Sequence, residues 1–177
     1  MQTNEIPVLF SADEIRERIT NLSCEIGLKM PADLMIVSLL KGSFVFTADL
    51  IRALHGIGLH PQVDFMTLSS YGIGKESSKT ITINRDLVEE VKGRNVLLLD
   101  DILESGRTLQ FARNLIVERG AASVKVAVLL EKPGKKETPV TADFVGFTIP
   151  DKFVVGYGLD YANYYRELPY VGVLDIH

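Results

Sequence analysis

Cysteine is nearly absent from this chain: Cys24 is the one example in 177 residues. No intrachain disulfide can form, and a reducing cytoplasm is the expected location. The longest apolar runs fall well short of the roughly 18 residues that a membrane-spanning helix needs. The first residues, MQTNEIPVLFSADE, lack the basic start and apolar stretch of a secretion signal, so we expect no such signal.

A basic excess is also missing. Lys and Arg total 19 against 23 Asp and Glu, which gives a formal net charge of −4. This balance argues against non-specific nucleic-acid binding, which usually shows a positive excess. An acidic protein can still bind a phosphorylated small molecule through a metal ion, local Lys or Arg, or helix N-termini. The length favours one domain over residues 1–177, with a single buried core.

Apolar periodicity predicts helices that alternate with strands. Ser-Ala-Asp-Glu at 11–14 has the form of a capping box, and we expect the helix that it starts to end at Gly27. A second helix is predicted to end near 56–58, and a third to end at Gly120. A strand pair is expected around 81–88, and nearly continuous apolar runs predict buried strands at 33–40, 63–70, 96–99 and 123–130. This alternation is typical of βαβ units and a parallel sheet.

The stretch VLLLDDILESGRTL, residues 96–109, places two adjacent acids at the end of a predicted strand. In open α/β sheets, ligands bind beyond the carboxyl ends of the strands. Residues 104–108 form the turn into the next helix, whose first N–H groups lack internal partners and can bind phosphate. Asp100 and Asp101 offer hard oxygen donors that suit Mg²⁺ or ribose hydroxyls. A phosphate ester with a magnesium-bound polyol would satisfy the whole stretch.

Simpler interpretations compete for the paired acids. The aspartates could merely cap the following helix, and this structural alternative stays open. A P-loop is excluded because GxxxxGK[ST] does not occur. A phosphoryl-accepting receiver domain also pairs acids at a strand end, but at its first strand, whereas Asp100 and Asp101 lie in mid-chain.

VLLLDDILESGRTL resembles the phosphoribosyl-diphosphate (PRPP) motif of the type I phosphoribosyltransferases. Three further stretches resemble the 6-oxopurine branch, the hypoxanthine-guanine phosphoribosyltransferases: SLLKGSFVFTADL at 38–50, SSYG at 69–72 and DKFVVGYGLDYANYYRELPYVGVL at 151–174. The similarity runs from about Leu34 to the end of the chain. It implies an α/β fold with a central, mostly parallel sheet flanked by helices. A small hood is expected mainly from about 150–177, with the N-terminal segment as a candidate contributor.

The implied reaction is Mg²⁺-dependent purine salvage. PRPP and hypoxanthine or guanine would give IMP or GMP and pyrophosphate, in a homodimer or homotetramer. Two rivals remain: a regulatory RNA-binding protein on the same scaffold, and a phosphoribosyltransferase for another base. The acidic charge disfavours RNA binding, and Lys132, facing an oxo group, disfavours adenine. Xanthine is harder to exclude.

The resemblance also assigns roles to individual residues. Glu104 would be the general base that takes the proton from purine N7; the family usually has aspartate there, and glutamate is longer by one methylene. Metal binding is assigned to Asp100, Asp101 and Asp160, and the two adjacent acids would also hold the ribose hydroxyls. PRPP and its phosphates are further assigned to Ser105, Gly106, Arg107, Thr108, Lys41, Gly42 and Arg166, with a cis peptide at Leu40–Lys41.

The purine is assigned to the C-terminal part of the chain. Lys132 would donate to its O6, Phe153 would stack on it, the Val154 backbone would bond its edge, and Asp160 would lie nearby. Ser70 and Tyr71 match the lid of the family, and the polar, glycine-bearing segment 71–79 independently predicts a mobile loop. Without the resemblance, Phe153 would pass for a core residue and Lys132 for a surface lysine.

Overall fold

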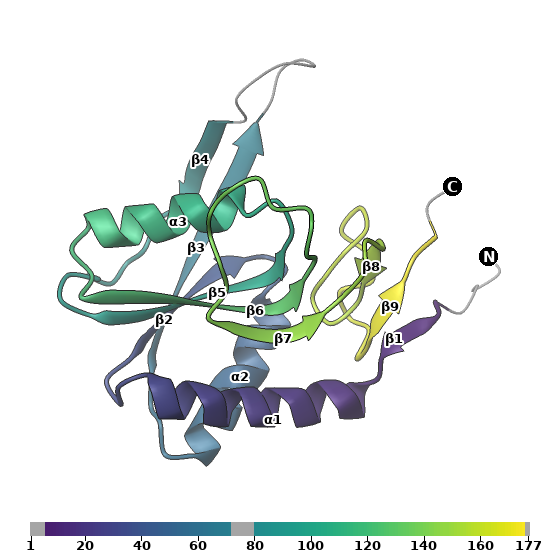
Figure 1. Ribbon diagram of the computed structural model, residues 1–177, viewed down its shortest axis with the longest axis horizontal. Helices are drawn as coiled ribbons and strands as arrows, with labels where there is room; N and C mark the ends of the chain where they lie inside the picture. The colour runs from purple at the N-terminus through teal and green to yellow at the C-terminus, as the bar shows by residue number, and fades with distance from the viewer. Residues whose placement is uncertain (1–5, 72–79, 176–177) are drawn as a thin grey trace.

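A computed structural model describes residues 6–71 and 80–175, apart from the side chain of Tyr71. Figure 1 shows the elements in chain order from purple to yellow. The helices are α1 (Ala12–Lys29), α2 (Phe44–Gly56) and α3 (Arg107–Glu118). The strands are β1 (Val8–Phe10), β2 (Met35–Leu40), β3 (Gln62–Tyr71), β4 (Thr80–Arg85), β5 (Asn95–Leu103), β6 (Ser123–Glu131), β7 (Phe144–Thr148), β8 (Val154–Val155) and β9 (Val171–Val173).

A six-stranded central sheet has the order β4-β3-β2-β5-β6-β7. All neighbouring strands are parallel except β4, which runs antiparallel to β3. Helices α1 and α2 cover one face and α3 covers the other (Figure 1). The mostly parallel sheet flanked by helices is therefore confirmed, and the apolar runs at β2 and β5 are continuous because both faces of these strands are buried.

The expected strand pair around 81–88 is wrong. Only β4 forms there, and it ends at Arg85. Beyond it, the carboxylate of Asp64 in β3 accepts hydrogen bonds from the backbone N–H groups of Val88 and Glu89, at 2.7 and 2.9 Å. These N–H groups are thus satisfied by a side chain, so no second strand is needed to pair them.

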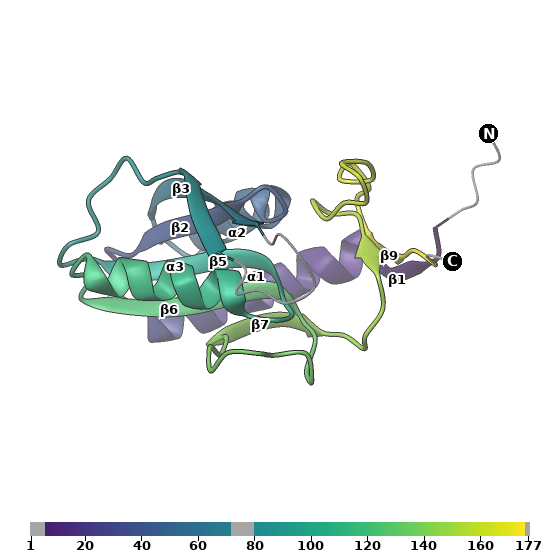
Figure 2. The ribbon, with the colours of Figure 1, turned by 90° about the horizontal axis from the view of Figure 1, so that it is seen from above.

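A second, three-stranded sheet has the order β1-β9-β8, and we call it the small sheet. Figure 2 shows it beyond one end of the central sheet, close to the start of α1. It joins the two ends of the chain, because Val8 and Phe10 in β1 pair with β9. The Phe10 ring stacks on Phe147 of β7 with centroids 4.0 Å apart, which attaches the small sheet to the central one.

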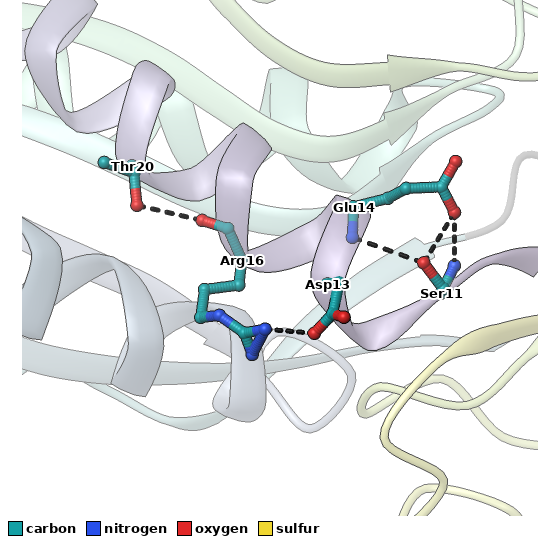
Figure 3. A network of polar contacts seen from close by, with 5 residues as sticks. All are labelled: Ser11, Asp13, Glu14, Arg16 and Thr20. Atoms are coloured by element: carbon teal, nitrogen blue, oxygen red, sulfur yellow. Dashed lines mark hydrogen bonds and ion pairs between the residues drawn. The ribbon is translucent and has the colours of Figure 1, made fainter.

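The capping box that starts α1 is present (Figure 3). Ser11 Oγ accepts from Glu14 N at 3.3 Å, and the Glu14 carboxylate accepts from Ser11 N at 2.8 Å. The Glu14 carboxylate also accepts from Ser11 Oγ at 2.7 Å, and its bonds from the backbone N–H and the hydroxyl of Ser11 lower the pKa of Glu14. The expected end at Gly27 is wrong, because the helix continues to Lys29. A Cβ on Gly27 would lie 2.7 Å from Ile57 Cδ1, so this glycine allows the end of α2 to approach closely.

Ser11→Ala is expected to lower the free energy of unfolding at pH 7 by about 1 kcal/mol, because the first turn of α1 loses its cap. Because the pKa of Glu14 is lower in the folded protein, ionisation of its carboxylate stabilises the folded state. This part of the stability is present above the ordinary pKa of a glutamate and is lost as the pH falls through the lowered value.

Urea unfolding of wild type and Ser11→Ala at pH 7 and about pH 3 measures both effects. The difference between the two proteins should be smaller in acid. Asn21→Ala, at an exposed position inside the same helix, is the control and should not destabilise. A difference that stays constant with pH would show that the Ser11 hydroxyl does not stabilise the ionised Glu14 carboxylate.

Candidate functional site

Two adjoining cavities lie at the carboxyl ends of the central strands. The first has a volume of about 250 Å³ and lies against the ends of β2 and β5 and the start of α3. The second has a volume of about 410 Å³ and lies between β5, the residue after β6, and the segment from Asp151 to Asp160. They share Asp101, Ile102 and Glu104. Topology predicts a ligand site at this edge of the sheet, and the cavities occupy that edge.

Asp100 and Asp101 lie within β5, which continues past them to Leu103. The carboxylate of Asp100 accepts from Asp101 N at 3.0 Å, and that of Asp101 accepts from Ile102 N at 2.9 Å. Burial and the adjacent charge of Asp101 raise the pKa of Asp100 well above its usual range. Burial also raises the pKa of Asp101. The pair is therefore held in a setting that disfavours two negative charges.

The turn from β5 into α3 is shaped by Gly106, which has φ of 78° and is the N-cap of the helix. A Cβ there would be strained and would lie 2.5 Å from Thr138 Oγ1 and 2.7 Å from Val140 Cγ1. The carbonyl of Ser105 accepts from Glu137 N at 2.9 Å, so segment 137–140 supports the turn from behind. The first cavity is lined here by Ser105, Gly106 and Thr108, which expose a helix N-terminus to any ligand.

Arg107 takes a different direction from its neighbours in the turn. It is exposed, and its guanidinium forms an ion pair with Glu137. It does not line the first cavity. The structure thus brings Ser105, Gly106 and Thr108 together at this cavity and leaves Arg107 outside it.

A group of charged side chains surrounds Lys132, which follows β6 directly and is 6% exposed. Its Nζ lies 3.5 Å from Glu104 Oε1 and 3.9 Å from Asp151 Oδ1. Lys135 Nζ lies 2.7 Å from Asp151 Oδ2, and this contact lowers the pKa of Asp151 and raises the pKa of Lys135. Because Lys135 is the closer partner of Asp151, the carboxylate of Glu104 is the principal partner of the buried ammonium.

The segment after β2 packs tightly against the acids. The Leu40–Lys41 peptide is cis, as the resemblance implied, and Lys41 is exposed. A Cβ on Gly42 would overlap the carboxylate of Asp101. A Cβ on Gly158 would in turn overlap the carbonyl of Gly42. Three segments that are far apart in the sequence therefore meet here, with the backbone of Gly42 against the side chain of Asp101 and the backbone of Gly158 against that of Gly42.

The remaining expected residues lie around the second cavity. Phe153 is 41% exposed and packs edge-on against Tyr161, with centroids 5.7 Å apart. Phe153 and Val154, the first residue of β8, line this cavity together with Asp160. Arg166 Nη2 lies 2.8 Å from Asp160 Oδ1, and its Nη1 donates to the Gly158 carbonyl at 2.6 Å. Arg166 therefore borders the site through Asp160 but lines neither cavity.

The three carboxylates expected to bind metal are divided between the cavities. Asp100 lines the first, Asp160 the second, and Asp101 both. Within residues 6–71 and 80–175, no group of three or more acidic, His or Cys side chains is arranged to hold a metal ion. The carboxylate oxygens of these residues nevertheless fit Mg²⁺, which takes one or two carboxylates and completes its shell with substrate and water oxygens.

The sequence did not point to Asp151 and Lys135. Asp151 begins a stretch that was singled out, but only folding shows that it lies beside Lys132. Glu137 and Thr138, behind the turn, were missed for the same reason. Ser70 lies in β3 and is exposed, whereas the proposed mobile loop falls mainly on 72–79, outside the described residues. No helix of the described residues is long and apolar enough to cross a membrane.

Comparisons with known proteins find relatives of this chain in sequence and in structure. A phosphoribosyl transferase domain model matches residues 11–162. Hypoxanthine phosphoribosyltransferase of Escherichia coli K12 is 42% identical over 170 residues, covering 94% of each chain. The Haemophilus influenzae protein of the same name is 40% identical over 97% of each chain. A crystal structure of hypoxanthine phosphoribosyltransferase from Staphylococcus aureus has a TM-score of 0.90 and 38% identity, covering 97% of this chain and 93% of that one.

Asp100→Asn is expected to raise the melting temperature at pH 7 by about 2–4 °C, because it removes one of two crowded negative charges. A carboxyl with a raised folded-state pKa costs stability only where the unfolded state is ionised, above the ordinary pKa of an aspartate. The gain should therefore diminish as the pH falls toward that value.

Calorimetric melting of wild type and Asp100→Asn at pH 7 and about pH 4 tests this expectation. Asp33→Asn, which neutralises an exposed acid ahead of β2, is the control for the change in net charge. A variant that melts at or below the wild-type temperature at pH 7 would show that the pair is not under electrostatic stress.

Proposed function

We propose that this chain, which belongs to the phosphoribosyltransferase family, is a purine-salvage enzyme. It transfers the 5-phosphoribosyl group of PRPP to N9 of hypoxanthine and releases IMP and pyrophosphate. The observation that carries this proposal is the sharing of Asp101 and Glu104 by two cavities, one beside the helix N-terminus and one beside Lys132. Sugar phosphate and base would then meet at the shared residues.

The first cavity suits the phosphoribosyl group. Its 5′-phosphate would lie at the N-terminus of α3, bound by backbone N–H groups and the hydroxyls of Ser105 and Thr108. The ribose hydroxyls would donate to Asp100 and Asp101. Hydroxyl donors would offset the burial and mutual repulsion of two neighbouring ionised carboxylates. The raised pKa of Asp100, which reflects that burial and repulsion, therefore supports a ligand of this kind.

The second cavity suits the base. Lys132 would donate to O6, Glu104 would accept the proton from N7, and Phe153 would cover one face of the ring. An adenine amino group at the same place would meet the ammonium with further donors, so an oxo group is favoured. Guanine has the same O6 and N7 as hypoxanthine, and we include it as a second substrate that gives GMP.

The leaving group would lie beside the segment after β2. Lys41 is exposed at this edge, and the backbone of Gly42 lies against Asp101. Arg166 would reach pyrophosphate only after exchanging its bonds to Asp160 and Gly158, and its planar fork suits that anion. Arg107, held outward by Glu137, we assign to the 5′-phosphate only through its backbone N–H.

Asp100, Asp101 and Asp160 would hold Mg²⁺, together with PRPP oxygens and water. The ion would supply positive charge to the departing pyrophosphate. The chain itself would orient the ribose, accept the purine proton at Glu104 and exclude water from the ribosyl carbon. We extend the proposal to a lid that includes Ser70 and Tyr71, to a hood formed by the small sheet and the segment 150–170, to a homodimer or homotetramer, and to a cytoplasmic location.

The alternatives are not favoured. The relatives of similar length carry the name hypoxanthine phosphoribosyltransferase, which supports neither a regulatory RNA-binding protein nor a xanthine-preferring enzyme. The net charge of −4 is also unsuited to a nucleic-acid surface.

Nucleotide formation should be measured by ultraviolet absorbance with PRPP and each of hypoxanthine, guanine, xanthine and adenine. We expect turnover with hypoxanthine, none with adenine, and loss of activity in EDTA that Mg²⁺ restores, because the carboxylates hold PRPP through the ion. Absence of turnover with every base, in the presence of Mg²⁺, would refute the proposed function. Turnover that persists in EDTA would refute the metal assignment alone.

Glu104→Gln is expected to reduce kcat by at least about 100-fold, because the amide cannot accept the purine proton. Calorimetric titration should still detect PRPP binding, since the phosphate turn and the paired aspartates are intact. Glu104→Asp restores the carboxylate on a shorter stem and should recover activity. Unchanged kcat in Glu104→Gln would exclude proton transfer to this residue.

A further inference from the structure

Three buried hydroxyls lie directly beneath the segment formed by Leu40, Lys41 and Gly42. They belong to Ser38 within β2, Ser43 at the N-cap of α2, and Thr47 one turn later. Ser38 and Ser43 are 0% exposed and Thr47 is 1% exposed. Ser38 Oγ lies 2.6 Å from Ser43 Oγ and 2.7 Å from Thr47 Oγ1. Polar groups this deeply buried are retained in a core only when their partners satisfy them.

The Ser43 hydroxyl is used in an unusual way. Ser43 is the N-cap residue of α2, where serine normally accepts from the first backbone N–H groups of the helix. Here its side chain makes no such bond. It donates instead to the carbonyl of Leu39 in β2, across the base of the segment. The helix loses a cap, and the two ends of the segment are tied together.

Counting hydrogens shows that the network is closed. Ser43 donates to Leu39 O, and Thr47 Oγ1 donates to Ser43 O at 2.8 Å. Ser38 then holds the one remaining hydrogen and has two hydroxyl neighbours, so it can donate to only one of them at a time. All three hydroxyl hydrogens are therefore used within the network, and no spare donor is left for a ligand. The network therefore acts on its surroundings by position and not by binding.

The backbone that this hydroxyl network positions lies against residues of the site. Gly42 precedes Ser43 directly, and its backbone lies so close to Asp101 that a Cβ would overlap the carboxylate. The carbonyl of Gly42 also lies against Gly158, whose own carbonyl accepts from Arg166. A shift of Ser43 would therefore move the backbone that contacts both an acid of the first cavity and the support of Arg166.

We propose that Ser38, Ser43 and Thr47 are positioning residues for the pyrophosphate end of PRPP. This inference rests on the proposed function, because it takes Lys41 and Gly42 to lie beside the leaving group. The three hydroxyls hold that backbone in register with Asp101, and none of them lines the cavity assigned to the base.

Ser43→Ala tests the inference. The KM for PRPP, and for pyrophosphate in the reverse reaction, should rise by about two- to tenfold, the effect of one lost hydrogen bond. The KM for hypoxanthine and the calorimetric Kd of IMP, which carries no pyrophosphate, should stay within about twofold. Ser23→Ala is the matched control, since Ser23 is also 0% exposed but donates within α1, to Thr20 O.

Thr47 provides a second test, which distinguishes an effect on folding from an effect on the position of the backbone. Thr47→Val keeps the shape and loses the hydroxyl, whereas Thr47→Ser keeps the hydroxyl and loses a methyl group. Positioning predicts that Thr47→Val raises the KM for pyrophosphate and Thr47→Ser does not. The inference is overturned if Thr47→Ser is the more affected, if all the KM values rise equally, or if Ser43→Ala behaves like Ser23→Ala. Failure of the proposed function differs from these outcomes, because the wild-type chain would then form no IMP.

Discussion

Two carboxylates held side by side in a strand are the constraint on which the rest of the site depends. Burial and mutual repulsion raise the pKa of Asp100, so the ionised pair reduces the stability of the fold. The β5 ladder does not require acids at either position, because backbone atoms alone form it. A strand that carries such a cost is typical of a binding site, where a ligand with hydroxyls or positive charge offsets it. We propose that binding of such a ligand recovers part of the stability that the free protein loses at this pair.

Backbone contacts, and not long side chains, fix the position of the Asp101 carboxylate in the site. Gly42, in the segment after β2, lies against Asp101, and Gly158, in the segment after β8, lies against Gly42. Neither position has space for a Cβ. The carboxylate is thus confined by main chain, which deforms less than a flexible side chain would. Residues from three distant parts of the sequence gain a fixed arrangement in this way, and a site for phosphates and a metal requires such fixed geometry.

The sequence predicted those parts of the fold and site that depend on neighbours along the chain. The Ser11 capping box, the apolar strands and the turn at Gly106 are local patterns, and the structure contains all three. The helix end expected at Gly27 and the strand pair expected around 81–88 were wrong, because packing against Ile57 and hydrogen bonds to Asp64 involve residues far from these positions in the sequence. The small sheet was only partly foreseen, since its pairing joins opposite ends of the chain. Asp151 and Lys135 were missed because the contacts that Asp151 makes with Lys132 and Lys135 are tertiary.

The longer stem of Glu104 has a consequence for recognition of the base. Lys132 is buried, and a buried ammonium without a partner is strongly destabilising. Asp151 is held by Lys135, so Glu104 at 3.5 Å provides most of the compensation in the free protein. On the proposed assignment, a base would enter between them only by replacing this ion pair with an acceptor for Lys132 and a donor for Glu104. An oxo group beside a ring N–H would supply both, whereas an amino group would leave the ammonium unpaired. We therefore propose that selectivity for 6-oxopurines follows from the burial of one lysine and the reach of one carboxylate.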